Sequence, residues 1–291
     1  MTTTTRKRAL VTGASGGLGS AIAERLAHDG AHVIVHANRR LEAATALVER
    51  LRAAGLSAEP CSFDITDRAA THAACEALLL GGPIQILVNN AGTHDDAVFP
   101  ALREAQWQHV IDVSLNGFFH VTQPLMLPMM RTRWGRIVNI SSVAALTGNR
   151  GQVNYAAAKG ALNSATKALA LEAASRGVTV NAVAPGIIDS GMAEDTFDKA
   201  TIERLVPMKR AGTAAEVETF DFITLHGVRW PTRFFERIVK PFRLAVHDWR
   251  LTGLDVNRGM TAAELSGPSF TGAAVAPASA LPVLPVRSSP R

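Results

Sequence analysis

The sequence is poor in cysteine and contains no long apolar run. Two cysteines, Cys61 and Cys75, match neither a metal-ligand spacing nor a disulfide framework. We therefore expect a protein of the reducing cytoplasm with no metal site. No apolar run is long enough to span a bilayer, and the first residues lack the apolar core of a signal peptide. The spaced histidines His28, His32 and His36 are expected to lie on the surface or in a strand rather than to bind a ligand.

Charge of either sign is not concentrated. The formal net charge is +5, and lysines and arginines are scattered rather than gathered in a stripe with stacking aromatics. This distribution argues against nucleic-acid binding, although a basic surface can attract an acidic protein partner. Hydrophobic residues make up 47% of the 291 residues and charged residues 19%, a composition that can build a large core.

Short β-branched runs alternate with longer alanine-rich segments that have apolar residues at helical spacing. This alternation predicts an α/β domain, in which a doubly wound parallel sheet lies between two layers of helices. The expected strands are 9–12, 33–35, 58–63, 84–88, 136–140 and 178–183. The expected helices are 18–28, 41–54, 68–80, 104–131 and 153–175.

A glycine-rich turn, TGASGGLG at 12–19, joins the first expected strand to the first helix. Glycines here let the backbone approach a pyrophosphate, and the helix amino terminus offers free N–H groups. After the second strand, where a carboxylate commonly binds a ribose 2′-hydroxyl, the chain has Asn38, Arg39 and Arg40. The two arginines stand where a 2′-phosphate would lie and favour NADPH over NADH. The alternative is that they begin a solvated helix face.

Tyr155 and Lys159 are four residues apart in an expected helix, so their side chains lie on one face. A lysine ammonium near a phenol lowers the pKa of the phenol and prepares it for proton exchange. Ser142 follows the fifth expected strand, where its hydroxyl could polarise a carbonyl. Taken alone, the pair could equally be a surface feature of a helix.

These motifs together resemble the short-chain dehydrogenase/reductase family over roughly residues 7–217. The matching features, in the order found in that family, are TGASGGLG, Asn89-Asn90-Ala91-Gly92, Ser142, Tyr155-x-x-x-Lys159 and Pro185-Gly186. Within the family, the sequence is most similar to 3-oxoacyl-[acyl-carrier-protein] reductases. The resemblance implies a Rossmann-type fold in three αβα layers. It also implies NADPH-dependent reduction of a 3-oxoacyl thioester linked to acyl carrier protein, by a homo-oligomer that is a tetramer or a dimer.

The resemblance gives each matching residue a role. Tyr155 would protonate the carbonyl oxygen, Lys159 would lower the pKa of Tyr155 and bind the nicotinamide ribose, and Ser142 would hold the substrate oxygen. Arg133 and Arg176 would dock the acidic carrier protein, with ordinary surface charge as the alternative. The cofactor would be lined by Gly13, Ser15, Gly17, Leu18, Gly19, Asn38, Arg39, Asp64, Ile65, Asn90, Ala91, Gly92, Pro185, Gly186 and Ile188.

The chain departs from the family in three places. Ser114 replaces a proton-relay asparagine and is expected to hold a water instead. Gly16 stands where many NADPH-using members have a basic residue, which weakens the case for NADPH. After residue 217, an aromatic- and arginine-rich segment replaces the family's last helix and strand. We expect one domain over residues 1–217, an atypical segment of it at 218–260, a disordered tail at 261–291 and a weakened oligomer.

Two other functions stay open at this point. A dehydrogenase for another alcohol, a sugar or a coenzyme A thioester would carry the same catalytic residues. A non-catalytic, cofactor-binding interaction protein is the alternative from another class, suggested by Ser114 and by the atypical segment.

Overall fold

The computed structural model describes residues 6–189, 199–206 and 208–217. The atypical segment expected at 218–260 and the tail expected at 261–291 lie outside the described residues. Within the described ranges, no helix is both long enough and apolar enough to cross a membrane.

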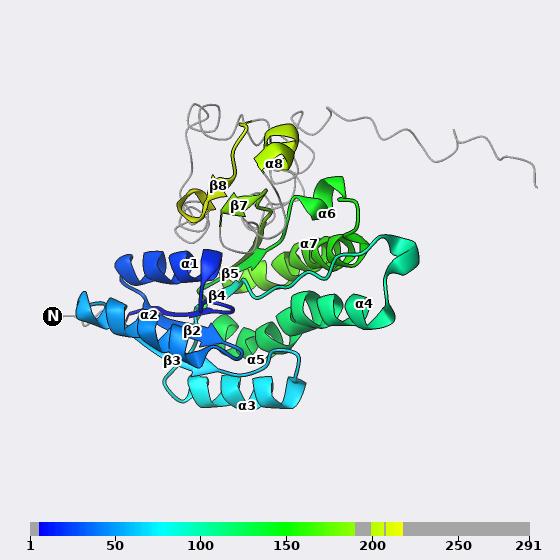
Figure 1. Ribbon diagram of the computed structural model, residues 1–291. Helices are drawn as coiled ribbons and strands as arrows, with labels where there is room; N and C mark the ends of the chain where they lie inside the picture. Colours follow the sequence, from blue (N-terminus) through cyan, green and yellow to red (C-terminus); the bar gives the residue numbers. More distant parts are fainter. Residues whose placement is uncertain (1–5, 190–198, 207, 218–291) are drawn as a thin grey trace, which may run out of the picture.

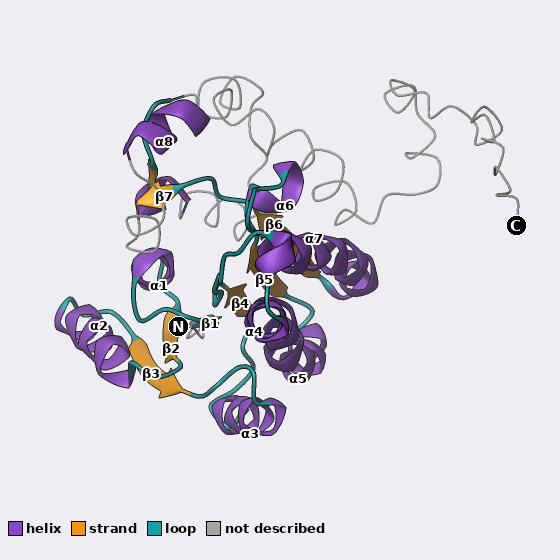
Figure 2. Cartoon of the chain, turned by 45° about the vertical axis from the view of Figure 1, so that its right-hand side comes forward, coloured by secondary structure: helices purple, strands orange, loops and turns teal. Residues whose placement is uncertain are grey.

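Among the described residues, six parallel strands form the central sheet, with helices on either side of it (Figure 1). Their order, β3-β2-β1-β4-β5-β6, can be followed in Figure 2. The chain enters at β1, moves outward through β2 and β3, and then crosses back to β4 on the other side of β1. This reversal opens a crevice at the carboxyl ends of β1 and β4, where such sheets bind their ligands. The expected doubly wound Rossmann-type fold is confirmed. The strands are β1 (Arg8–Val11), β2 (His32–Ala37), β3 (Ala58–Ser62), β4 (Ile86–Asn89), β5 (Gly135–Ile140) and β6 (Val178–Val183).

Helices cover both faces of the sheet (Figure 2). One buried cluster joins α1 (Gly17–His28) and α2 (Leu41–Ala53) to one face. The other cluster joins α3 (Arg68–Leu79), α5 (Gly117–Arg131) and α7 (Val153–Ala173) to the opposite face. Strand residues alternate between the two clusters and are apolar on both sides, as a parallel sheet between two helix layers requires.

The single helix expected over 104–131 has three consecutive parts. They are α4 (Glu104–Ile111), a π-helical turn η2 (Asp112–Asn116) and α5. π-helical turns within α-helices are frequent at functional sites. Here the π turn packs against α7 and buries Ser114.

Several short elements were not predicted from the sequence, because each is too short to show a hydrophobic period. Two of them, β7 and β8, pair with each other in a small second sheet. The short elements are η1 (Phe99–Ala101), α6 (Ala144–Thr147), η3 (Ala174–Arg176), β7 (Ile188–Asp189), α8 (Lys199–Leu205) and β8 (Gly212–Thr213).

Candidate active site

The glycine turn after β1 is built so closely that side chains do not fit. Gly13 has φ of 64°, and a Cβ there would lie 2.9 Å from the Cα of Ala91. A Cβ at Gly19 would lie 2.5 Å from the Nδ2 of Asn90. The turn therefore presses its backbone against the segment that follows β4, and the glycines are required for that approach.

The Asn-Asn-Ala-Gly motif holds the turn from the β4 side. Asn90 Nδ2 donates to the carbonyl oxygens of Thr12 at 2.9 Å and Gly13 at 3.1 Å. Thr12 Oγ1 accepts from the backbone N–H groups of Asn90 at 3.1 Å and Ala91 at 3.0 Å. A Cβ at Gly92 would lie 3.1 Å from Lys159 Nζ, so the motif also borders the expected catalytic pair.

The amino end of α1 is suited to an anion. Gly16 precedes the helix and has no side chain with which to cap it, and the first turn carries no acidic residue. Ser15, Gly17 and Leu18 belong to the same turn. Free N–H groups and the positive end of the helix dipole together bind phosphate groups. The turn therefore fits the pyrophosphate of a dinucleotide.

Asp64 and Ile65 follow β3 at the same edge of the sheet. Asp64 Oδ1 accepts hydrogen bonds from Thr66, at 2.9 Å from its N–H and 2.8 Å from its hydroxyl. Burial acts to raise the pKa of Asp64, but the hydrogen bonds from Thr66 and Asn38 and the charge of Arg39 outweigh it and lower the pKa. The carboxylate is therefore ionised and fixed in direction.

The two arginines after β2 lie against different neighbours. Arg39 is close enough to Asp64 for its charge to lower the pKa of that carboxyl group. The Arg40 guanidinium lies 3.7 Å from the position of a Cβ on Gly16, directly beside the glycine turn. Both arginines were expected near a 2′-phosphate, and Arg40 is the one that the structure places next to the turn.

Tyr155 and Lys159 on α7 meet Ser142, which follows β5. The side chains of Ser142 and Tyr155 share a hydrogen bond. Ser142 Oγ also accepts from the N–H of Ala144 at 3.2 Å. Lys159 is only 3% exposed, and its Nζ donates to the carbonyl oxygen of Ile140 at 2.7 Å. That Nζ lies 5.8 Å from the centre of the Tyr155 ring.

The protonation of this group corrects one expectation. Burial raises the pKa of Tyr155, the hydrogen bond with Ser142 lowers it in part, and the Asp96 carboxylate raises it further. Burial lowers the pKa of Lys159 to about 8. The expected lowering of the Tyr155 pKa by Lys159 is wrong here, because the ammonium donates to the Ile140 carbonyl and not to the phenol. Tyr155 is therefore a protonated phenol near neutral pH.

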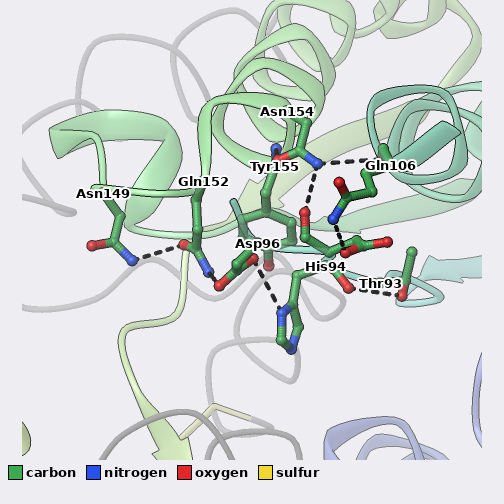
Figure 3. A network of polar contacts seen from close by, with 9 residues as sticks. Thr93, His94, Asp96, Gln106, Asn149, Gln152, Asn154 and Tyr155 are labelled. Carbon is green, nitrogen blue, oxygen red and sulfur yellow. Dashed lines mark hydrogen bonds and ion pairs between the residues drawn. The ribbon is translucent and has the colours of Figure 1, made fainter. Parts of the chain in front are cut away.

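A loop after the Asn-Asn-Ala-Gly motif lies against the start of the Tyr155 helix (Figure 3). Asp96 Oδ2 accepts from Gln152 Nε2 at 2.8 Å, and Asp96 Oδ1 lies 3.2 Å from His94 Nδ1. Asn149 Nδ2 in turn donates to Gln152 Oε1 at 2.9 Å. This polar chain places one carboxylate beside the site, which no sequence motif predicted.

Asn154 ties the same loop to α4. Its Nδ2 donates to the carbonyl oxygens of Asp95 at 2.9 Å and Gln106 at 3.3 Å, and its Oδ1 accepts from the N–H of Tyr155 at 2.9 Å. Gln106 Nε2 also donates to the carboxylate of Asp95. Asn154 is fully buried, so these bonds fix the first turn of α7 and with it the direction of Tyr155.

A second buried network lies within the layer beneath the site. Asn89 Nδ2 donates to Asn139 Oδ1 at 2.8 Å and to Thr122 Oγ1 at 3.1 Å. Asn139 Nδ2 donates to Thr166 Oγ1 at 2.8 Å. These bonds connect β4 and β5 to α5 and α7, and so hold α7 in register with the sheet.

Ser114 is the residue of the π turn that faces the interior. It is 2% exposed, and its Oγ has no hydrogen-bond partner within the part of the chain that the structure describes. Asn116 donates instead to Asp112 Oδ1 at 2.7 Å, one turn back on its own helix. A buried hydroxyl that has no protein partner is commonly hydrogen-bonded to an ordered water.

The segment expected beside the nicotinamide lies next to Ser142. The N–H of Val143 donates to the carbonyl oxygen of Pro185 at 2.9 Å. Gly186 is exposed, and Ile188 pairs with Gly212 in the small sheet of β7 and β8. The structure thus brings Pro185, Gly186 and Ile188 to the same edge as the glycine turn.

Arg133 and Arg176 lie at the opposite edge. Each precedes a strand, β5 or β6, at its amino end, whereas Ser142 follows β5 at its carboxyl end. Arg133 Nη2 donates to the carbonyl oxygen of Ser175 at 3.3 Å, so the two arginine turns are neighbours. Six strand residues with a rise of about 3.3 Å each separate them from Ser142 of the same chain by about 20 Å.

The cysteines are not placed for nucleophilic chemistry. Burial raises the pKa of the Cys61 and Cys75 thiols to about 12, so neither forms a thiolate near neutral pH. Within residues 6–217, leaving out the undescribed gaps, no group of three or more His, Cys, Asp or Glu side chains could hold a metal ion.

A phenol, a hydroxyl and a buried ammonium beside a glycine cradle define an α/β dinucleotide-binding protein arranged for proton transfer at an oxygen atom. The chain belongs to the short chain dehydrogenase family, whose sequence pattern it matches over residues 7–201.

Two names occur among three relatives with high similarity to this chain. The chain is 43% identical to 3-oxoacyl-[acyl-carrier-protein] reductase FabG of Aggregatibacter actinomycetemcomitans over 152 residues, 52% of this chain and 63% of that relative. It is 43% identical to nodulation protein G of Rhizobium sp. (strain N33) over 219 residues, 73% of this chain and 86% of that relative. FabG of Aquifex aeolicus (strain VF5) is 41% identical over 155 residues, 53% and 62% of the two chains. The chain thus spans less than two thirds of the length of these reductases.

Proposed function

We propose that this protein is a nicotinamide-dependent oxidoreductase that interconverts a carbonyl and an alcohol beside Tyr155. The observation that supports it best is the meeting of Ser142, Tyr155 and buried Lys159 next to a glycine turn that fits a pyrophosphate. The nicotinamide, when bound, supplies or accepts the hydride.

Two side chains, those of Ser142 and Tyr155, then act on the substrate oxygen in different ways. The Ser142 hydroxyl donates to that oxygen and Tyr155 delivers its proton, because its raised pKa keeps the phenol protonated. Lys159, with a pKa of about 8, is mostly a cation at neutral pH, and we assign it to binding the nicotinamide ribose. The unpartnered Ser114 hydroxyl positions a water against α7.

We propose NADPH as the cofactor. Gly16 leaves room at the turn, and the Arg40 guanidinium lies there, so a positive charge borders the turn without a basic residue at position 16. Arg39 is partly balanced by Asp64. Arg40→Asp should therefore reduce the ratio of kcat/KM for NADPH over NADH by at least about tenfold, equivalent to about 1.4 kcal/mol.

Arg39→Asp serves as the matched variant, and we expect it to shift the same ratio less. An unchanged ratio in Arg40→Asp would contradict the assignment of the 2′-phosphate site. A larger shift in Arg39→Asp would transfer the role to that residue.

For the substrate we propose a 3-oxoacyl thioester, with acyl carrier protein as its carrier. The similarity to several reductases of that name supports this choice, while the similarity to nodulation protein G leaves the carrier less defined. NADPH oxidation should be measured with a 3-oxoacyl thioester and with a panel of sugars and simple ketones. Faster turnover of the panel would favour a dehydrogenase of another substrate class. Tight NADPH binding without turnover of any carbonyl would favour a non-catalytic binding protein.

A further inference from the structure

His36, near the end of β2, is 1% exposed and lies under the glycine turn. Its Nδ1 accepts the backbone N–H of Gly13 at 3.1 Å, and its Nε2 lies 2.9 Å from the carbonyl oxygen of Phe63. A backbone N–H only donates and a carbonyl oxygen only accepts. The contacts therefore define a neutral imidazole with its proton on Nε2.

His36 connects two segments that are distant in sequence. Its own carbonyl oxygen accepts from the N–H of Ala14 at 2.8 Å, so backbone and ring both hold the glycine turn. The ring also packs on the Phe63 ring, with centroids 4.2 Å apart. Phe63 immediately precedes Asp64 and Ile65. The imidazole thus spans from the pyrophosphate side of the crevice to its adenine side.

The glycine turn needs the hydrogen bond between the Gly13 N–H and His36 Nδ1 to keep its conformation. Gly13 has φ of 64° and no Cβ, so its conformation is fixed by neighbours and not by its own side chain. Asn90 holds the turn from the β4 side through the Thr12 and Gly13 carbonyl oxygens. His36 is the side chain that holds the Gly13 N–H from the β2 side.

We propose that His36 is a positioning residue for the dinucleotide, which sets cofactor affinity by fixing the glycine turn at one distance from the adenine-side segment. The proposal rests on the proposed use of a nicotinamide cofactor. It assigns His36 to cofactor affinity and leaves the chemical step to Tyr155, Ser142 and Lys159.

Burial keeps the ring neutral near pH 7. It lowers the pKa of His36 to about 4, although the hydrogen bond to Phe63 and the charge of Asp64 act in the opposite direction. Nδ1 therefore remains an acceptor for Gly13 throughout the neutral pH range.

Two conservative variants separate the two ring contacts. In His36→Asn the side-chain oxygen falls near the position of Nδ1 and can still accept from Gly13, while the bond to Phe63 is lost. In His36→Gln the amide reaches the position of Nε2 and can donate to Phe63, while the acceptor for Gly13 is lost. His32→Asn, at the other end of β2, is the control, because His32 contacts Ser57 and Glu59 away from the turn.

The dissociation constant for NADPH should be measured on the full chain by cofactor fluorescence, together with kcat, KM and the thermal midpoint. We expect His36→Gln to weaken NADPH binding about tenfold or more, since the Gly13 N–H would then be buried without an acceptor. His36→Asn should retain most of the affinity, and kcat at saturating NADPH should change little in either. His32→Asn should bind NADPH as the wild type does.

Equal NADPH affinity in His36→Gln and the wild type would overturn the proposal. Equal losses in the Asn and Gln variants, in proportion to a fall in thermal midpoint, would also overturn it, by showing a structural role alone. If the wild type binds neither NADPH nor NADH, the proposed function fails and this proposal fails with it. If the wild type binds NADPH or NADH but the His36 variants do not show the expected affinities, the proposal for His36 fails and the proposed function stands.

Discussion

At the scale of single residues, Tyr155→Phe tests the contribution of the phenolic proton of Tyr155 to catalysis. The ring and its packing remain, but the transferable proton and the hydrogen bond with Ser142 are lost. We expect carbonyl reduction to fall about 10²–10⁴-fold, the usual contribution of one positioned acid, with NADPH affinity nearly unchanged. Steady-state kinetics and cofactor titration measure the two quantities. Retention of most of the activity would show that another group donates the proton.

His36 should make the folded state less stable as the pH falls. Its pKa is lowered from 6.5 to about 4, so between these values the unfolded chain binds more protons than the folded one. The neutral ring therefore contributes fully above pH 6.5, and stability is lost as the pH falls towards 4. The loss is roughly 3 kcal/mol for a shift of this size.

Urea unfolding of the wild type and of His36→Asn at pH 7 and pH 4.5 measures this effect. Carboxyl groups with lowered pKa values, such as Asp64 and Glu59, also destabilise the fold in acid, but they are common to both proteins. We expect the variant to lose less stability on acidification. Equal losses in the two proteins would mean that His36 does not titrate as stated.

The sequence predicted the candidate catalytic residues better than their supports. Tyr155 and Lys159 have a local spacing and Ser142 follows a recognisable strand, and the family resemblance of the combined motifs then selected them. Asp96, Asn154 and His36 act through contacts with segments that lie 23 to 59 positions away. No local pattern encodes such partners, because they meet only once the sheet and helices have packed.

At the scale of elements, two glycines with nearly equal φ angles provide a matched test. Gly177 after η3 has φ of 72° and Gly55 after α2 has φ of 76°. A Cβ at Gly177 would lie 2.3 Å from the carbonyl oxygen of Arg133, whereas one at Gly55 meets nothing within 4 Å. Gly55→Ala should cost about 1–2 kcal/mol through backbone strain alone. Gly177→Ala should cost clearly more, because the turns before β5 and β6 must also separate.

Chemical denaturation of both variants measures the difference. Since the φ strain is common to them, the excess in Gly177→Ala reports the close approach of the two turns. Equal costs would show that the turn before β5 yields without penalty.

Long elements were predicted well and the irregular ones were not. Five expected helices and six expected strands correspond to observed elements, because strands buried on both faces and amphipathic helices leave clear patterns. The π turn at Asp112–Asn116 was missed, because the sequence was interpreted as one continuous helix over 104–131. The extra residue of a π turn shifts the direction of the following side chains, but it leaves the amino-acid composition of the helix unchanged.

At the scale of the whole molecule, the position of Arg133 and Arg176 bears on the carrier. They lie about 20 Å from Ser142 of their own chain, the length of a six-residue strand. A carrier docked on them would have to span that distance to Ser142 of the same chain or meet the crevice of a second copy. We expect Arg133→Glu with Arg176→Glu to impair carrier-linked substrates more than small thioester mimics, since steering acts on the charged carrier.

Arg131→Glu, a nearby exposed charge at the end of α5, controls for a general change in surface potential. Kinetics with both substrate types should be paired with light scattering, which gives the number of copies in solution. Equal losses on both substrates would mean that the pair acts on folding. Unchanged turnover of carrier-linked substrates in the double variant would contradict this docking site.

Tyr155 is the sole phenol in all 291 residues, and this gives the molecule an unusual optical property. Any ultraviolet change from phenol to phenolate must arise at that one oxygen, with no background from other tyrosines. A simple absorbance titration of the unlabelled protein therefore reads the protonation of the candidate catalytic group directly. Its midpoint should lie above about 10, the ordinary value for tyrosine. Each compound added to the cuvette can then be judged by whether it moves that midpoint.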